Sequence, residues 1–184
     1  MKNILLTLAV AATAFSIPSV ANADDFQVSA GGTYLFDSSD TELSFPMATV
    51  RGTYYFTENW GVEAEGSFGL GSVDNYAGTG IDIDLSQQFG GYAIGRFKTG
   101  EKGEWFGRIG YRAGELDFSA GGLNGDTSYQ GVSFGAGYSY FFNEGLGLRA
   151  EVTTSGASLD GNLKPEGNFT SVSVSMTYRF GAEK

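Results

Sequence analysis

The chain has 184 residues, with 21 acidic and 11 basic side chains, no histidine and no cysteine. The formal net charge of −10 disfavours nucleic acid as a partner, and the absence of cysteine excludes a disulfide-stabilised secreted scaffold. With 29 glycines, 3 prolines and 15% aromatic residues, the composition favours strands and tight turns over helices.

The first 23 residues differ from the rest and have the pattern of a secretory signal peptide. A lysine at position 2 precedes a short apolar run, and small residues end the segment at Ala23, directly before Asp24. The apolar run is too short to cross about 30 Å of hydrocarbon. The pattern predicts cleavage between Ala23 and Asp24, which leaves residues 24–184 as one exported domain that passes through the periplasm.

The mature chain repeatedly alternates large apolar residues with small or polar ones, which is the two-residue period of a β-strand. In the last segment, Val172, Val174 and Met176 fall on one face, and Ser171, Ser173 and Ser175 on the other. Eight segments behave in this way: 26–36, 47–56, 61–70, 89–98, 104–116, 131–142, 146–154 and 171–180.

The connections between these segments alternate in length. Three are tight turns, at Thr57–Trp60, Thr99–Gly103 and Asn143–Gly145. Four are longer and polar, acidic or glycine-rich, at Asp37–Phe45, Gly71–Ser86, Ser119–Asp126 and Asp160–Asn168. An even number of strands with short turns at one end predicts an all-β, eight-stranded, antiparallel up-and-down transmembrane β-barrel with both termini in the periplasm.

The structural alternative is a soluble barrel such as a lipocalin, in which the apolar face would point inward. Every arginine lies on the polar face of a predicted strand: Arg51, Arg96, Arg108, Arg112, Arg149 and Arg179. The mature lysines lie at or beyond strand ends, although a water-facing strand surface would use lysine freely. Aromatic residues also gather where strands meet the short turns, as expected of a membrane-interface girdle. These patterns favour the membrane barrel.

The six arginines share the predicted inner face with Glu63, Glu65 and Glu151, and this set is the candidate site of the chain. One interpretation is a buried network of ion pairs that fills the lumen and locks the barrel. The other is a narrow conduit whose ion pairs switch. An eight-stranded barrel is just wide enough for side chains to fill it, which favours the plug. Six arginines face three glutamates, and the sequence does not identify what compensates the excess.

The sequence gives little support for a catalytic site. The usual general base is missing because the chain has no histidine, although Gly131–Gly135 matches the G-x-S-x-G nucleophile pattern. That pattern requires a strand-to-helix turn, whereas here it lies in the middle of a predicted strand. The acidic loop residues Asp74, Asp82, Asp84 and Asp126 are interpreted as solvated charge rather than as a calcium site. We therefore expect no enzymatic activity, no metal and no cofactor.

The signal segment, the eight alternating segments and the final Ser171–Phe180 strand resemble the small outer-membrane β-barrel family that includes OmpA-type transmembrane domains and OmpX-like proteins. The resemblance implies a Gram-negative outer-membrane protein in contact with lipid. It also implies recognition by the barrel assembly machinery through Tyr178 and Phe180, although Gly181–Lys184 follow the usual closing aromatic residue.

The expected function is non-enzymatic, in envelope structure or in contact with an unidentified surface ligand through the external loops. Two alternatives remain open, a small solute or ion pore and a soluble periplasmic ligand carrier.

Overall fold

A computed structural model describes residues 26–37, 44–73, 81–120, 123–159 and 167–180. The predicted signal segment, with its cleavage site between Ala23 and Asp24, lies outside these residues. The strands are β1 Phe26–Asp37, β2 Ser44–Tyr55, β3 Trp60–Gly69, β4 Ser72–Val73, β5 Ile81–Thr99, β6 Gly103–Ala120, β7 Leu123–Phe141, β8 Leu146–Leu159 and β9 Gly167–Phe180. The described residues contain no helix that is long and apolar enough to cross a membrane.

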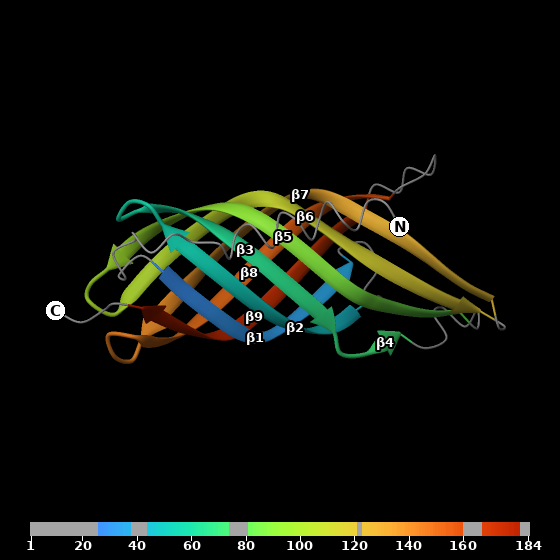
Figure 1. The fold of residues 1–184 in the computed structure, drawn as a ribbon, viewed down its shortest axis with the longest axis horizontal. Coiled ribbons are helices and arrows are strands. Elements are labelled where there is room, and N and C mark those ends of the chain that lie inside the picture. The colour runs from blue at the N-terminus through green and yellow to red at the C-terminus, as the bar shows by residue number, and fades with distance from the viewer. Residues whose placement is uncertain (1–25, 38–43, 74–80, 121–122, 160–166, 181–184) are drawn as a thin grey trace.

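One antiparallel sheet closes on itself to form a barrel, as Figure 1 shows. Its strands follow the order β3-β2-β1-β9-β8-β7-β6-β5-β4, and pairing of β3 with β5 closes the ring. β4 has only two residues and pairs beside the outer part of β5, so eight strands make the barrel wall. Closure pairs the backbone groups of every wall strand on both sides, which removes free sheet edges from the hydrocarbon. The predicted all-β, eight-stranded transmembrane barrel is confirmed.

The two faces of each strand follow the predicted alternation. On β9, Ser173 is 4% exposed and Val174 is 51% exposed, although the two residues are neighbours in the chain. The same division holds on β3, where Glu63 and Glu65 are buried inside the barrel and Val62 lies on the outside. The soluble carrier is therefore the wrong alternative, because a lipocalin-like barrel would carry its apolar residues inside.

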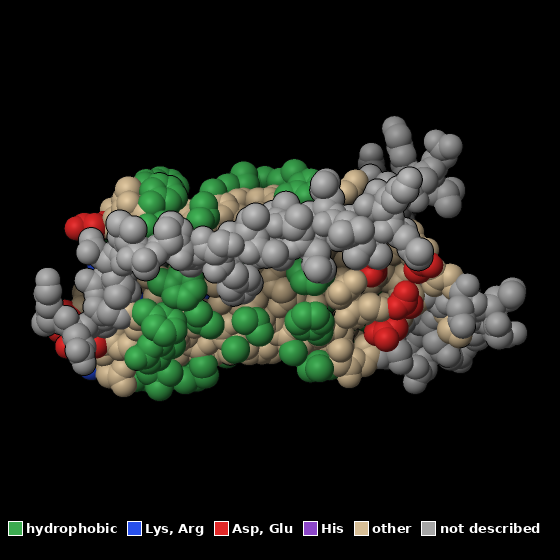
Figure 2. Space-filling view, in the orientation of Figure 1, with side chains coloured by type: hydrophobic (Ala, Val, Ile, Leu, Met, Phe, Trp, Pro, Cys, Tyr) green, Lys and Arg blue, Asp and Glu red, His purple; other side chains and the backbone are tan. Residues whose placement is uncertain are grey.

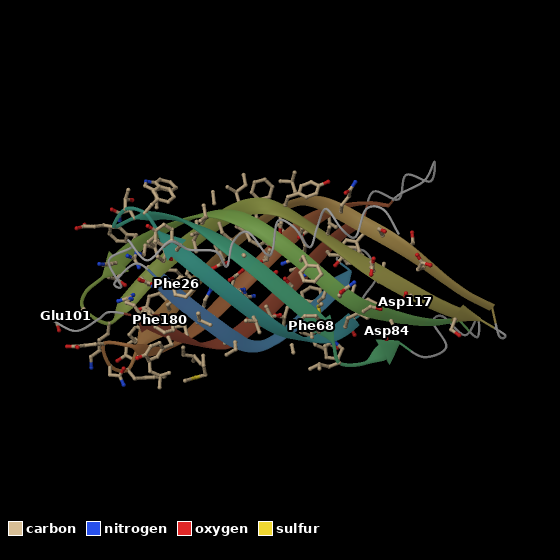
Figure 3. The ribbon with its side chains drawn as sticks, viewed as in Figure 1. Phe26, Phe68, Asp84, Glu101, Asp117 and Phe180 are labelled. Atoms are coloured by element: carbon tan, nitrogen blue, oxygen red, sulfur yellow. The ribbon has the colours of Figure 1, made fainter. Side chains whose placement is uncertain are left out.

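Hydrophobic side chains gather in patches along the flank of the barrel (Figure 2). At the end that carries the β5–β6 turn, marked by Glu101 in Figure 3, aromatic rings contact one another across strands. The ring centroids of Trp105 and Tyr138 lie 4.9 Å apart, and Phe180 lies 5.5 Å from Phe26. Such a band suits the boundary between hydrocarbon and lipid headgroups, where an amphipathic ring has one apolar and one wet side.

Three short turns close this end of the barrel, as predicted. In the turn between β7 and β8, the Asn143 side chain accepts hydrogen bonds from the backbone N–H groups of Gly145 at 3.0 Å and Leu146 at 2.7 Å. In the turn between β2 and β3, the Thr57 hydroxyl accepts a hydrogen bond from the Trp60 N–H at 2.9 Å. Gly100, in the turn between β5 and β6, has a φ of 77°, a left-handed conformation that glycine adopts without strain.

The opposite end differs from the prediction, because β5, β6 and β7 are much longer than the segments predicted for them. Half of the expected loop Gly71–Ser86 and most of the expected loop Ser119–Asp126 is strand, with a register shift between Leu85 and Gln87. Figure 1 shows the three strands projecting beyond β1 to β3. In β5 the extension does alternate, because Ile81, Ile83 and Leu85 are separated by Asp82 and Asp84. The inward side chains at its base, Leu85 and Leu116, are buried. The alternation in β5 was therefore a signal present in the sequence, within an acidic segment interpreted as a loop, whereas residues 123–128 of β7 show no apolar alternation.

Candidate functional site: a charged network in the lumen

Seven of the nine predicted lumen residues form one buried cluster, which we call the central network: Arg51, Glu63, Glu65, Arg108, Arg112, Arg149 and Glu151. Their side chains come from β2, β3, β6 and β8 and meet in the lumen because each occupies an inward position of its strand. None has a side chain more than 3% exposed. The barrel wall thus brings together charges that lie up to 100 positions apart in the chain.

Arg108 lies at the centre of this network and contacts all three of its carboxylates. Its Nη1 is 2.6 Å from Glu63 Oε1 and 2.8 Å from Glu65 Oε2, and its Nη2 forms an ion pair with Glu151. Arginine suits this position because its planar guanidinium carries several donors in a fixed arrangement and stays charged when buried. The contacts join β3, β6 and β8 across the interior.

Arg149 repeats this bridging between β8 and β3. Its Nη1 is 2.6 Å from Glu63 Oε2, and its Nη2 is 2.6 Å from Glu151 Oε2. Glu63 and Glu151 therefore each contact two guanidiniums. Buried ion pairs stabilise only when such additional hydrogen bonds offset the cost of removing the charges from water.

Glu65 has a different set of partners, because three arginines share this one carboxylate. Arg51 Nε is 2.8 Å from Glu65 Oε2, and Arg112 Nη2 is 3.2 Å from Glu65 Oε1, in addition to the contact from Arg108. The Tyr92 hydroxyl accepts from Arg112 Nε at 3.2 Å and donates to Glu65 at 3.3 Å. On this side of the central network, guanidiniums therefore outnumber carboxylates the most.

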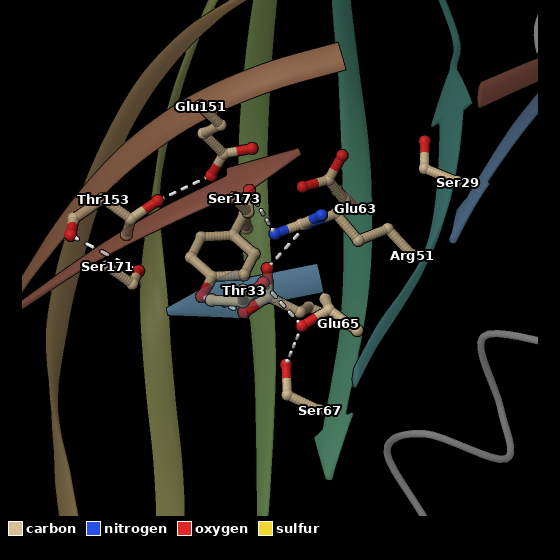
Figure 4. A network of polar contacts seen from close by, with 12 residues as sticks. Ser29, Thr33, Arg51, Glu63, Glu65, Ser67, Glu151, Thr153, Ser171 and Ser173 are labelled. Carbon is tan, nitrogen blue, oxygen red and sulfur yellow. Dashed lines mark hydrogen bonds and ion pairs between the residues drawn. The ribbon is translucent and has the colours of Figure 1, made fainter. Parts of the chain in front are cut away.

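Serine and threonine hydroxyls make further hydrogen bonds to the charged groups, as Figure 4 shows for part of the network. Thr153 donates to Glu151 at 2.6 Å, and Thr53 donates to Glu63 at the same distance. Ser173 accepts from Arg51 Nη2 at 3.1 Å. The short side chains predicted on the inner face thus provide both space and hydrogen bonds.

The other two predicted lumen arginines, Arg96 and Arg179, lie apart from the central network. Both contact Glu104, at 3.7 Å and 2.8 Å, and we call these three residues the lower cluster. It lies toward the short turns, where Arg96 also donates to the Glu58 carbonyl at 2.8 Å. Arg179 is the more accessible partner, with 18% of its side chain exposed.

Sequence reasoning missed Glu104, although a signal was present. Glu104 has the same parity as Arg108 and Arg112 in the segment 104–116, so it belongs to the predicted inner face. With Glu104 included, four carboxylates face the six arginines. Part of the arginine excess is thus compensated.

Aromatic rings beneath four guanidiniums are a second feature that the sequence did not predict. The guanidinium carbons lie 3.7 to 4.0 Å from the ring centroids of these four pairs: Arg96 over Tyr55, Arg108 over Tyr92, Arg149 over Phe106 and Arg179 over Phe141. A desolvated cation over an aromatic face gains about 2 kcal/mol. The rings thus stabilise positive charge that the carboxylates leave uncompensated.

Apolar side chains also occupy the lumen beyond the polar network. Tyr55, Ile94 and Phe106 form a buried cluster. Toward the projecting end, where β1 to β3 stop, the buried inward residues are Leu35, Phe45, Met47, Leu85 and Leu116. The inner face therefore carries large apolar side chains toward both ends of the central network, in addition to its polar and charged residues.

Two other predicted features occupy ordinary strand positions. Tyr178 and Phe180 point outward from the end of β9 with ring centroids 5.0 Å apart, and Gly181–Lys184 lie outside the described residues. Ser133, in the nucleophile-like pattern, is fully buried in β7 and its hydroxyl is 2.8 Å from that of Ser155. This position offers no strand-to-helix turn of the kind that exposes a nucleophile.

The chain matches the family described as "Outer membrane protein beta-barrel domain" over residues 7–180. Solved structures share its fold at low sequence identity. The attachment invasion locus protein Ail of Yersinia pestis is 16% identical, with 85% of this chain and 97% of that chain covered and a TM-score of 0.59.

Two further structures are similar to the same degree. For the Neisserial surface protein A the values are 15% identity, 84% and 96% coverage, and a TM-score of 0.64. The N-terminal barrel domain of OprF of Pseudomonas aeruginosa is 14% identical, with 84% of this chain and 97% of that chain covered and a TM-score of 0.58. A comparison with curated proteins finds no match. The lipid-facing barrel and the family match over most of its length show that this chain belongs to the outer membrane β-barrel domain family and is a bacterial outer-membrane protein.

Proposed function

We propose that this protein is a closed, non-enzymatic barrel that contributes to the structure of the envelope and offers a contact surface at its projecting end. The central network carries this proposal, because seven charged side chains bonded to one another cross the lumen. The apolar residues toward both ends of this network also oppose a continuous water path. A pore would require water along the whole axis, and apolar constrictions tend to exclude it.

The projecting part of β5, β6 and β7 is the proposed contact surface. Its outward face carries a row of acids on directly paired positions, since Asp84 pairs with Asp117 and Asp117 with Asp126. Figure 3 places Asp84 and Asp117 at the end opposite Glu101. Ail has been solved with the heparin analogue sucrose octasulfate, which is a polyanion. The acidic row would repel such a molecule, so the surface partner proposed here is not a polyanion.

Conductance of the purified protein in a planar lipid bilayer tests the closed lumen. We expect no steady current from the wild-type barrel, and none from Glu65→Ala, because loss of one carboxylate leaves most of the packing in place. Steady channels in the wild type would contradict the proposal and favour the pore. Steady channels in Glu65→Ala with unchanged stability would identify the network as a gate.

A deletion strain separates the two parts of the proposed role. We expect loss of the gene to increase detergent sensitivity, and the wild-type protein to restore resistance. A matched variant replaces residues 117–126 with a two-residue Asn-Gly turn, which shortens the projection and leaves the lipid-facing wall intact. Rescue by this variant would assign the detergent phenotype to the barrel wall. Failure of a correctly inserted variant would assign it to the projection, and an unaltered deletion strain would contradict the envelope role.

The export and assembly steps are also proposals. Cleavage after Ala23 would give a mature protein that starts at Asp24, which N-terminal sequencing of the protein from outer membranes tests. Recognition by the assembly machinery through Tyr178 and Phe180 predicts that a Tyr178→Ser, Phe180→Ser double variant accumulates in the periplasm. Val172→Ser, Val174→Ser is a control that also replaces two apolar residues by serine on the same face, but away from the strand end.

A further inference from the structure

The central network contains four guanidiniums and three carboxylates, so it has a surplus of one positive charge. The lower cluster has a similar surplus, but there Arg179 is partly open to solvent. In the central network every charged side chain is at least 97% buried. An uncompensated charge in such surroundings is costly, and proteins therefore pair buried charges.

The surplus lies beside Glu65. Arg108 and Arg149 both contact Glu63 and Glu151, whereas Glu65 is the only carboxylate that Arg51 and Arg112 contact in the part of the chain that the structure describes. The Tyr92 hydroxyl bridges Arg112 and Glu65, but it carries no charge when protonated. One carboxylate thus serves two guanidiniums that have no other acidic partner among the described residues.

Unused donors lie on these same two arginines, and Arg108 Nε in the same network is a third buried donor without a hydrogen-bond partner among the described residues. Arg51 Nη1 and Arg112 Nη1 are buried, and neither has a hydrogen-bond partner among the described residues. Both side chains are 98% buried, and both are held in place through their other nitrogens by Glu65, Ser173 or Tyr92. The Ser175 hydroxyl, also inside the lumen, lacks a partner in the same part of the chain.

We propose that the lumen binds one small monovalent anion, such as chloride, against the guanidiniums of Arg51 and Arg112. A single negative charge balances the central network, and a halide accepts hydrogen bonds from the unused N–H donors without requiring a particular geometry. The site lies beside the Glu65 carboxylate and is closed off by the barrel wall. The anion is a structural counter-ion, independent of any role of the protein at the cell surface.

Stability measurements in two salts test this site. The wild-type protein is unfolded with urea in lipid vesicles, at constant ionic strength, while sodium chloride replaces sodium gluconate. A ligand that binds only the folded state multiplies the folded-to-unfolded ratio by about ten for each tenfold rise in concentration above its dissociation constant. We expect chloride to shift the unfolding midpoint upward in this way. Equal midpoints in chloride and gluconate would overturn the proposal.

Two matched variants locate the effect. Arg112→Gln leaves three guanidiniums and three carboxylates in the central network, so the chloride dependence should disappear. Arg179→Gln makes the same charge change in the lower cluster, so it should keep the wild-type dependence. An unchanged chloride dependence in Arg112→Gln would contradict the site.

Bromide provides a readout that does not depend on a variant that folds. Wild-type crystals grown in sodium bromide should show an anomalous peak within hydrogen-bond distance of Arg51 Nη1 or Arg112 Nη1. Bromide peaks confined to the outer surface would overturn the assignment.

Discussion

The inner and outer surfaces of the barrel come from the same strands but obey opposite rules of burial. On β9, Ser173 is 4% exposed and Val174 is 51% exposed, so the polar residue is inside and the apolar residue outside. Side chains on the outer surface contact hydrocarbon, where their apolar area and their depth in the bilayer determine the free-energy cost of a substitution. The inside meets fixed partners, where each charge depends on a few neighbours. The same substitution type should therefore have effects that differ in size and cause on the two surfaces.

The largest effect is expected in the central network. Glu65→Ala should lower the free energy of unfolding by about 3 to 5 kcal/mol, because it leaves Arg51 and Arg112 without a carboxylate partner. Urea unfolding in lipid vesicles measures the loss. Ser67→Ala is a control on the same strand face, since it removes only a neutral hydrogen bond to Thr49. Equal stability of Glu65→Ala and Ser67→Ala would show that the ion pairs contribute nothing beyond packing.

A charge on the outer surface should be somewhat less damaging. Val174→Arg introduces a cation near the middle of the hydrocarbon at a cost of about 2 to 4 kcal/mol. Phe180→Arg, at the end of β9, should cost about 0 to 1 kcal/mol from its charge because the side chain reaches the interface. Refolding titrations of both variants compare the two depths. If Phe180→Arg proved the more destabilising, β9 would not be placed in the membrane as described here.

The lower cluster should respond less than the central network. Glu104→Ala should destabilise by about 1 to 3 kcal/mol, the usual cost of leaving buried donors unsatisfied. Arg179 can turn toward solvent, while Arg96 retains the Glu58 carbonyl and the Tyr55 ring. Urea unfolding together with that of Glu65→Ala tests this ranking. A loss for Glu104→Ala that matches the loss for Glu65→Ala would remove the distinction between the two clusters.

The smallest effect is expected in the short turns. Glu101→Gln changes a carboxylate that is exposed between β5 and β6 and has no ion-pair partner among the described residues. The unfolding midpoint should stay within experimental scatter of the wild type, because solvent screens such a charge. A clear loss of stability would mean that this turn has a partner outside the described residues.

Much of this architecture could be predicted because strand alternation is a local property. Val174 and Ser173 fall on opposite faces for geometrical reasons alone, so the faces of all eight strands follow once the register is known. The short turns could also be located, since Asn143 and Gly100 have side chains or conformations that tight turns require. The outer end of β7 could not, because residues 123–128 have no apolar period. The outer end of β5 does have one, at Ile81, Ile83 and Leu85, but it lies in an acidic segment that was interpreted as a loop.

The sequence by itself determined which charged residues enter the lumen, because parity along a strand places Glu63, Glu65 and Arg108 inside. Two contacts are also local, since Arg51 pairs directly with Glu65 across β2 and β3, and Arg149 lies two residues from Glu151 on β8. Only the tertiary structure decided the contacts between distant strands. Long arginine side chains reach across the barrel to partners on strands that are not their neighbours, and these distances depend on how far the strands tilt and shift as the sheet closes. For the same reason the sequence did not reveal that Glu104 forms a separate cluster, or that Tyr92 lies beneath Arg108.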